Sequence, residues 1–278
     1  MNAPARIWLC ADDYGISPSV NDAIRDLIAR GRINATSVIV VAPSFRQSEA
    51  DSLNALNAGA RRAAIGLHVT LTAPFKPLTK GFAHADADAF PTLPRALLLA
   101  VLRRYDTAQL AAEIAAQVDA FVSAFRRPPD FVDGHQHVQL FPQVRDAFLT
   151  VVKSKARLAW VRQCGRNVPF AKRFADKKAL LLDVLSRGFR IRASQFGVPI
   201  NPVFAGTYDF SSNADFAKLF PAFLDGLPEN SVVMCHPGKV DDELNRIDEL
   251  KTLREREYAY FAGDRFPDAL AACGLTLR

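Results

Sequence analysis

The stretch DGHQH at residues 133–137 places Asp133, His135 and His137 within five positions, directly after the apolar, strand-forming DFV. A carboxylate with two imidazoles is a common set of protein ligands for a divalent metal ion, and it leaves positions open for water and substrate. The alternative is a loop that caps a helix, because Pro142 is well placed to open the next one. We favour the metal site because further candidate ligands are predicted to lie beside it.

Those further candidates all follow predicted strands. Asp12 and Asp13 follow the first strand, His68 ends the third and His236 ends the seventh. Taken alone, the paired aspartates fit a turn, and a single histidine after a strand is usually a hydrogen-bonded loop residue. However, the carboxyl ends of parallel strands converge on one face of a barrel, where catalytic sites are built. The metal site is therefore expected to include Asp13 and His68.

Such a site suits metal-assisted hydrolysis of an amide or ester. A metal ion of this kind activates water and polarises a carbonyl group, while a nearby carboxylate serves as general base. We assign the base to Asp12 and the general acid to His236. Asp133 is expected to orient a ligand imidazole, since ligand histidines usually donate their second nitrogen to an acceptor, and His137 to brace the loop.

Other chemistry has less support in the sequence. There is no GxSxG motif, Walker loop or GxGxxG fingerprint in the sequence. Cys235, which lies beside His236, is kept as an alternative nucleophile. Arg162, after the fifth predicted strand, is expected to reach a substrate hydroxyl or phosphate, with a structural salt bridge as an equal alternative.

Short β-branched runs alternate with longer amphipathic segments along the chain, which is typical of βα units. Strands are predicted at 6–11, 35–41, 63–71, 158–163, 194–198, 231–236 and 274–278, with another leading into 133–137. Helices are predicted at 17–31, 44–59, 106–126, 142–154, around 171–188, at 212–226 and around 243–262, with one more short helix near the end. These seven or eight units predict an α/β fold, a single (β/α) barrel over residues 1–278, with an open doubly wound sheet as the alternative. The irregular segment 73–95 is expected to be a functional loop that closes over a substrate.

The composition argues against nucleic-acid binding, a disulfide scaffold and a membrane span. The net charge is +6, but the basic residues are scattered and form no stripe with interleaved aromatics, so no nucleic-acid partner is expected. The four cysteines are far apart, which fits a reduced cytoplasmic protein better than a disulfide scaffold or zinc cluster. We recognise no signal peptide, and the longest apolar run, 96–102, is too short to span a membrane.

Four motifs resemble, in order and spacing, those of the YdjC-like family of carbohydrate deacetylases, which includes chito-oligosaccharide deacetylases and hopanoid-associated members. They are ADDYGIS near the N-terminus, GLHVTLT at 66–72, DGHQHVQLFP at 133–142 and MCHPG at 234–238. Four motifs in this order are far more specific than any one of them.

The resemblance implies a deformed TIM-like barrel that removes acetyl groups from N-acetylated sugars, whether mono-, oligo- or lipid-linked saccharides. By motif position, Asp13, His68 and His135 would hold one divalent metal ion, with Asp12 as base and His236 as acid. Zinc and magnesium are the expected ions, with manganese or cobalt as alternatives.

The chain departs from the family pattern at two motifs. Gln136 and Gln139 stand where the family often has histidine, which leaves His135 and His137 intact. Tyr14 replaces a frequent phenylalanine, and we expect it to adjust packing or a substrate contact. A metal-dependent phosphoesterase and a non-catalytic sugar-binding barrel are the alternative functions, and a homodimer is expected from base rates alone.

Overall fold

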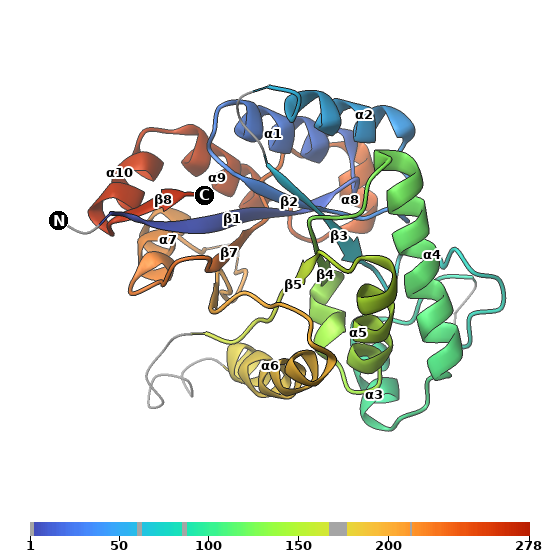
Figure 1. Cartoon of the computed structure of the whole chain (residues 1–278). Coiled ribbons are helices and arrows are strands. Elements are labelled where there is room, and N and C mark those ends of the chain that lie inside the picture. Colours follow the sequence, from blue (N-terminus) through green and yellow to red (C-terminus); the bar gives the residue numbers. More distant parts are fainter. Residues whose placement is uncertain (1–2, 60–62, 85–87, 167–176, 212) are drawn as a thin grey trace.

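The computed structural model describes residues 3–59, 63–84, 88–166, 177–211 and 213–278 (Figure 1). Within these ranges all the paired strands run parallel. The strands are β1 (Ala5–Tyr14), β2 (Ala35–Val38), β3 (Ala64–Val69), β4 (Phe131–Gly134), β5 (Trp160–Val161), β6 (Phe204–Ala205), β7 (Val232–Cys235) and β8 (Leu275–Leu277).

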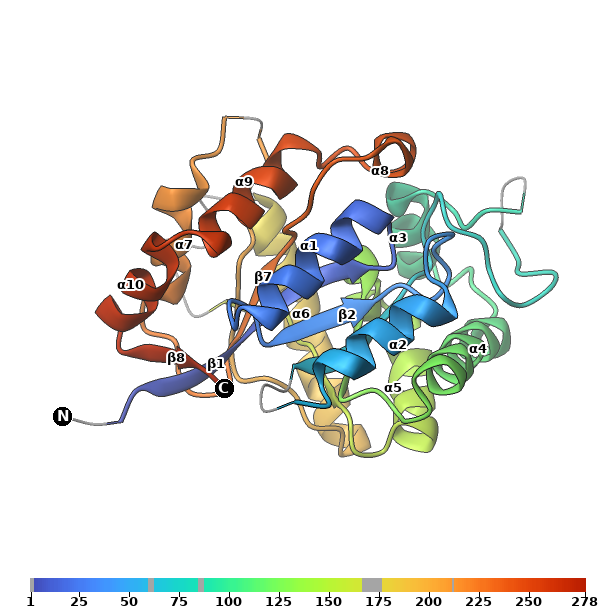
Figure 2. The same cartoon turned by 90° about the horizontal axis from the view of Figure 1, so that it is seen from above.

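Helices follow the strands along the chain and cover the outside of the sheet (Figures 1 and 2). They are α1 (Pro18–Ala29), α2 (Gln47–Leu56), α3 (Leu93–Val101), α4 (Thr107–Phe125), the short 3₁₀ helix η1 (His135–Leu140), α5 (Val144–Lys155), α6 (Lys177–Phe196), α7 (Phe216–Leu224), α8 (Asp242–Ile247), α9 (Thr252–Ala262) and α10 (Arg265–Ala272). In α1 the side chain of Ser17 caps the first turn and Pro18 opens the helix, as the sequence predicts.

The sheet has the strand order β5-β4-β3-β2-β1-β7-β6, and β8 pairs with the first residues of β1. Its two edges meet around residues 199–204. There the Val161 N–H donates to the Pro199 carbonyl at 2.8 Å, and the Phe204 N–H donates to the Gly165 carbonyl at 3.1 Å. Because scattered bonds of this kind close the ring in place of a continuous strand pair, the fold is a deformed (β/α) barrel, which confirms the predicted fold class.

One close approach explains the glycine of the GLH motif. Gly66 in β3 faces Phe131 of β4, and a Cβ at position 66 would lie 2.4 Å from the Phe131 ring. That ring stacks on Trp160 with centroids 4.6 Å apart. Any side chain at position 66 would therefore displace the aromatic pair that packs β3, β4 and β5 together.

Two predicted elements were wrong, and the helix α3 and the short strand β6 were missed. Residues 194–198 form no strand, since residues 194–196 are the last turn of α6 and Gly197, at φ +68°, ends that helix in the left-handed conformation. The predicted stretch 243–262 is two helices, α8 and α9. The helix α3 begins inside the segment 73–95, which was predicted to be irregular, and continues past its end. Residues 171–176 of the predicted helix 171–188 lie outside the described residues.

Among the described residues, no helix combines the length and the apolar character that a membrane span needs.

Candidate functional site

A cavity of about 710 Å³ opens at the carboxyl ends of the strands. Carboxylates and imidazoles that were predicted to lie at four different strand ends line this cavity. They are Asp12, Asp13, His68, His135, His137 and His236. Because these residues lie far apart in the chain, only the barrel topology brings them together.

The end of β1 presents two successive carboxylates to this cavity. In a regular strand, neighbouring side chains point to opposite faces. Here the pairing with β2 shifts between Ala11 and Tyr14, and Asp13 adopts a left-handed conformation with φ +69°. This bulge turns both Asp12 and Asp13 into the cavity, an unusual backbone geometry of the kind found at functional sites.

Asp13, His68 and His135 form a compact cluster. The Asp13 Oδ1 atom lies 3.0 Å from His135 Nδ1 and 3.4 Å from His68 Nε2. One ligand atom from each residue lies within 4.8 Å of the others. One carboxylate and two imidazoles at this spacing fit a divalent cation, since such sites commonly use three protein ligands and leave positions open.

Asp133 and Ser37 hold the His68 ring in place. His68 Nδ1 lies 2.5 Å from Asp133 Oδ1 and 3.1 Å from Ser37 Oγ. Burial alone would lower the pKa of His68, but the carboxylates of Asp133 and Asp13 outweigh it and raise this pKa to about 10. A cation that bound at Nε2 would displace the proton there, while the proton on Nδ1 stays hydrogen-bonded to Asp133, as is usual for ligand histidines.

Asp12 lies in a buried ion pair with Arg162. The two guanidinium nitrogens Nη1 and Nη2 donate to Asp12 Oδ2 and Oδ1 at 2.6 and 2.7 Å. Burial by itself would raise the pKa of Asp12, but Arg162 and His68 outweigh it and hold this pKa well below its usual range. Asp12 is therefore an ionised acceptor at the wall of the cavity throughout the physiological pH range.

The sequence model of the family described as YdjC-like protein matches residues 6–272. This match covers every residue of the cluster and both partners of the buried ion pair. The chain belongs to the YdjC-like family.

Curated relatives cover nearly the whole chain. A chitooligosaccharide deacetylase of Escherichia fergusonii is 27% identical over 269 residues, which span 92% of this chain and 93% of the relative. A chitooligosaccharide deacetylase of Citrobacter koseri is 24% identical over 273 residues, with coverage of 92% and 93%.

Solved structures share the fold. A protein of Enterococcus faecalis V583, proposed to act in cellobiose-phosphate cleavage, superposes with a TM-score of 0.73 at 20% identity, over 99% of this chain and 97% of the other. A lactam utilization protein of Thermus thermophilus superposes with a TM-score of 0.53 at 13% identity, over 98% and 99% of the two chains. At these identities the likeness establishes the fold alone.

In this YdjC-like chain, α9 supports the cluster of Asp13, His68 and His135 through Arg254. The buried Arg254 donates from Nη2 to Asp13 Oδ2 at 2.6 Å and also pairs with Asp248. Burial alone would raise the pKa of Asp13, but Arg254 and His135 outweigh it and hold this pKa well below its usual range. The guanidinium of Arg254 thus holds one oxygen of Asp13, and the other oxygen, Oδ1, stays directed at the two histidines.

The same helix fixes the segment that carries His236. The buried Glu257 accepts the main-chain N–H of His236 at 2.6 Å and the hydroxyl of Tyr208 at 2.7 Å. The His236 ring packs edge-on against Phe210, and its Nδ1 has no hydrogen-bond partner among the described residues. Burial lowers the pKa of His236, so its imidazole is neutral at pH 7 in the protein without substrate.

Glu257 predicts a pH dependence of stability. Burial raises its pKa to about 7, although the bonds from Tyr208 and His236 partly offset this effect. A carboxyl with a raised pKa stabilises the fold at low pH, and that contribution is lost as pH rises from the unfolded value of about 4.5 to about 7. We expect urea unfolding of the wild type to lose on the order of 3 kcal/mol over this interval relative to Glu257→Gln. Equal pH slopes for the two proteins would contradict the shifted carboxyl.

The structure also places the three remaining candidate residues, Tyr14, Arg162 and His137. Tyr14 is fully buried, and its hydroxyl donates to Glu49 and accepts from Arg25, so it packs between α1 and α2 and does not line the cavity. Arg162 is also fully buried, which favours the salt bridge over the substrate contact. His137 lines the cavity, but the contacts it makes are with Cys164 and Phe204 and not with a candidate ligand.

A second acidic group, Cys10, Asp12 and Asp133, also brings three potential ligand atoms within 4.8 Å of one another. Arg162 already lies in this group, with Nη2 3.0 Å from Cys10 Sγ and 2.6 Å from Asp133 Oδ2. The guanidinium supplies the positive charge there, so these carboxylates have no need of a metal ion.

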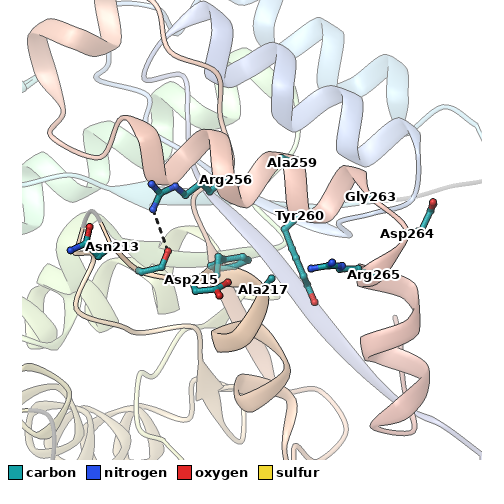
Figure 3. A pocket seen from close by; sticks show the side chains of 11 residues that line it. Asn213, Asp215, Ala217, Arg256, Ala259, Tyr260, Gly263, Asp264 and Arg265 are labelled. Carbon is teal, nitrogen blue, oxygen red and sulfur yellow. Dashed lines mark hydrogen bonds between the residues drawn. The ribbon is translucent and has the colours of Figure 1, made fainter.

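A second cavity, of about 730 Å³, lies between α7, α9 and α10 (Figure 3). Arg256 crosses one end and donates to the Ala214 carbonyl at 3.3 Å, while Tyr260 and Arg265 lie beside each other at the other end. Its lining has no histidine or cysteine and no grouped carboxylates among the described residues, so we place the chemistry in the cavity at the strand ends.

Proposed function

We propose that the chain is a metal-dependent hydrolase that removes an acetyl group from an N-acetylated sugar. The observation that carries this proposal is the cluster of Asp13, His68 and His135, with Asp12 and His236 in the same cavity. Its relatives over nine-tenths of the chain are chitooligosaccharide deacetylases. One catalytic domain spanning the chain would carry the activity.

A divalent cation held by Asp13, His68 and His135 would supply Lewis acidity that favours attack of water on the acetyl carbonyl. Asp12 takes the proton of the attacking water, because among the described residues its Oδ2 accepts a hydrogen bond only from Arg162, and a carboxylate oxygen can accept a second bond. Arg162 and Ser37 keep that carboxylate ionised and oriented.

His236 protonates the sugar nitrogen as the carbon–nitrogen bond breaks, because an amine is a poor leaving group without that proton. Its unpartnered Nδ1 and its place in the cavity support this role. Since the resting imidazole is neutral, it must take up a proton from solvent before it donates one, and Asp12 returns the proton of the attacking water to solvent to complete the cycle. Glu257 holds the main chain at this position.

Acetate release from N-acetylglucosamine and its oligomers tests the proposal. Metal-stripped protein is expected to be inactive and to regain activity with zinc, magnesium, manganese or cobalt. His135→Ala is expected to lose both the metal and the activity, because it removes one of three ligands.

Metal content separates the alternatives in the same experiment. Two ions per chain with hydrolysis of phosphate esters would establish a phosphoesterase instead. Sugar binding without acetate release from any substrate, with the cation present, would establish a sugar-binding barrel.

A further inference from the structure

The chain after β4 has an unusual backbone at two successive residues. Gln136 and His137 both adopt the left-handed conformation, with φ +53° and +60°. This conformation is uncommon for residues other than glycine, and residues that adopt it cluster at active sites. The imidazole of His137 lines the cavity at the strand ends, so this backbone geometry serves a side chain that faces the site.

One edge of the His137 imidazole is held by a thiol. Its Nδ1 lies 3.5 Å from Cys164 Sγ, and the ring packs edge-on against Phe204 with centroids 5.6 Å apart. Cys164 is itself fixed, because its main-chain N–H donates to Ser186 Oγ at 2.9 Å and its Sγ accepts from the side-chain amide of Gln139 at 3.8 Å. The wall of the barrel therefore sets the orientation of the imidazole.

The same contacts determine which nitrogen of His137 carries the proton. Burial raises the pKa of the Cys164 thiol, so the thiol keeps its proton at neutral pH. The amide of Gln139 donates to the sulfur, which leaves the S–H group available to donate in turn. An imidazole nitrogen accepts more readily than a thiol sulfur, so Nδ1 of His137 accepts from Cys164. The neutral ring therefore carries its proton on Nε2.

The Nε2–H group of His137 is a donor that the protein leaves available to a ligand. No residue that the structure describes accepts a hydrogen bond from Nε2, and this nitrogen is not buried. The charges of Asp12, His68 and His236 all act on the ring, which places it close to the base, to one candidate ligand and to the acid. His137 therefore presents a fixed donor to the same part of the cavity as these groups.

We propose that His137 is a further catalytic residue, which donates a hydrogen bond from Nε2 to the acetyl oxygen of the substrate as negative charge develops on that oxygen. A donor that is fixed before the reaction stabilises such a charge without the cost of reorganisation. The proton stays on His137 throughout, so Asp12 and His236 keep their roles in proton transfer. Cys164 is the positioning residue that fixes the ring and its tautomer. This inference rests on the proposed function and adds one group to its mechanism.

Acetate release from N-acetylglucosamine oligomers tests the role of His137. In His137→Ala, kcat is expected to fall about 10²-fold while KM stays within about threefold, because a donor to a developing charge acts in the transition state. His137→Gln, whose side-chain amide can replace the Nε2–H donor, is expected to recover about tenfold of that loss. A raised KM with unchanged kcat would mean that His137 binds a group of the ground state, such as a sugar hydroxyl, and would overturn the proposal. Loss of the metal from His137→Ala would also overturn it, by making the residue a ligand.

Two substitutions at Cys164 test the positioning role. Cys164→Ala removes the donor to Nδ1 and is expected to lower kcat about three- to tenfold, which is the effect of one hydrogen bond. Cys164→Ser supplies a hydroxyl donor in place of the thiol and is expected to keep kcat within about twofold of the wild type. Cys273→Ala, at an exposed cysteine, is the matched control and should leave kcat unchanged. Equal kcat values in the two Cys164 variants would overturn the role of the thiol.

The tautomer of His137 is a readout that needs no turnover. Nitrogen-15 NMR of the imidazoles, with the His137 signals identified by their absence from His137→Gln, is expected to show Nε2 protonated and Nδ1 unprotonated, with or without zinc. A proton on Nδ1 alone would make Nε2 an acceptor and would overturn the proposal. If no N-acetyl sugar releases acetate, the deacetylase proposal fails, and the same spectra still decide whether His137 presents a donor to the cavity.

Discussion

The Asp12→Asn variant is expected to retain its divalent cation and to lose about 10²- to 10⁴-fold in turnover. Asp12 lines the cavity beside the ligand cluster but is not one of its three members. An asparagine of the same shape keeps one oxygen acceptor but cannot accept a proton from water at neutral pH. The measurement is the rate of acetate release together with the metal content of the purified protein.

The low pKa of Asp12 limits its strength as a base. The ion pair with Arg162 holds that pKa well below its usual range, so Asp12 is always ionised but is a weak base. Proton transfer to it is favourable only where the acidity of the attacking water is also raised, which is the contribution of a bound cation. The residual activity of Asp12→Asn should therefore still depend on metal.

Asp119→Asn is the matched control, because Asp119 pairs with Lys155 on the surface and should tolerate the change without effect on turnover. Loss of the metal in Asp12→Asn would make Asp12 a ligand. Turnover within tenfold of the wild type, with the protein folded, would remove it from the mechanism.

The grouping of the three candidate ligands could be predicted because it depends on local patterns. Asp13, His68 and His135 each follow an apolar run that reads as a strand, and parallel strands of a barrel end on one face. The support of His68 by Asp133 follows from the same rule, since β3 and β4 are neighbours and these two residues are paired in register.

The residues that hold the candidate ligands in place could not be predicted in this way. Arg254 and Glu257 lie in the stretch TLREREY, whose alternating charges are typical of a solvated helix face, yet both are buried against the site. Ser37 lies within an apolar strand and carries no signal of its own. Their roles depend on which face of α9 and of β2 is buried by tertiary packing. The local sequence pattern does not predict which face that is.

Arg162→Met is expected to be the most destabilising substitution at this site. Arg162, Asp12 and Asp133 are at most 1% exposed, and the guanidinium pairs with both carboxylates. Removing one partner of a buried pair typically costs about 3–5 kcal/mol, because the remaining charge is desolvated and unpaired. For a chain of this size that corresponds to a fall in Tm of about 6–20 °C, measured by thermal unfolding at pH 7.

The pH dependence separates this cause from a simple loss of packing. In the wild type the pKa of Asp12 is below its unfolded value, so the pair stabilises the fold at neutral pH and that contribution is lost only in strong acid. Without Arg162, burial would raise the pKa of Asp12 above its unfolded value, and the folded variant would bind a proton more tightly than the unfolded chain. The stability deficit of Arg162→Met should therefore shrink between pH 7 and pH 4.

Arg192→Met is the matched control, since Arg192 pairs with Asp146 at the surface and its loss should cost less than about 1 kcal/mol at any pH. Arg162→Lys adds a second test, because lysine restores a positive charge without the fork that binds both oxygens of Asp12. It should recover part of the stability while leaving turnover impaired, since the base would no longer be held in its orientation. A deficit in Arg162→Met that is constant with pH would mean that the arginine stabilises the barrel through packing alone.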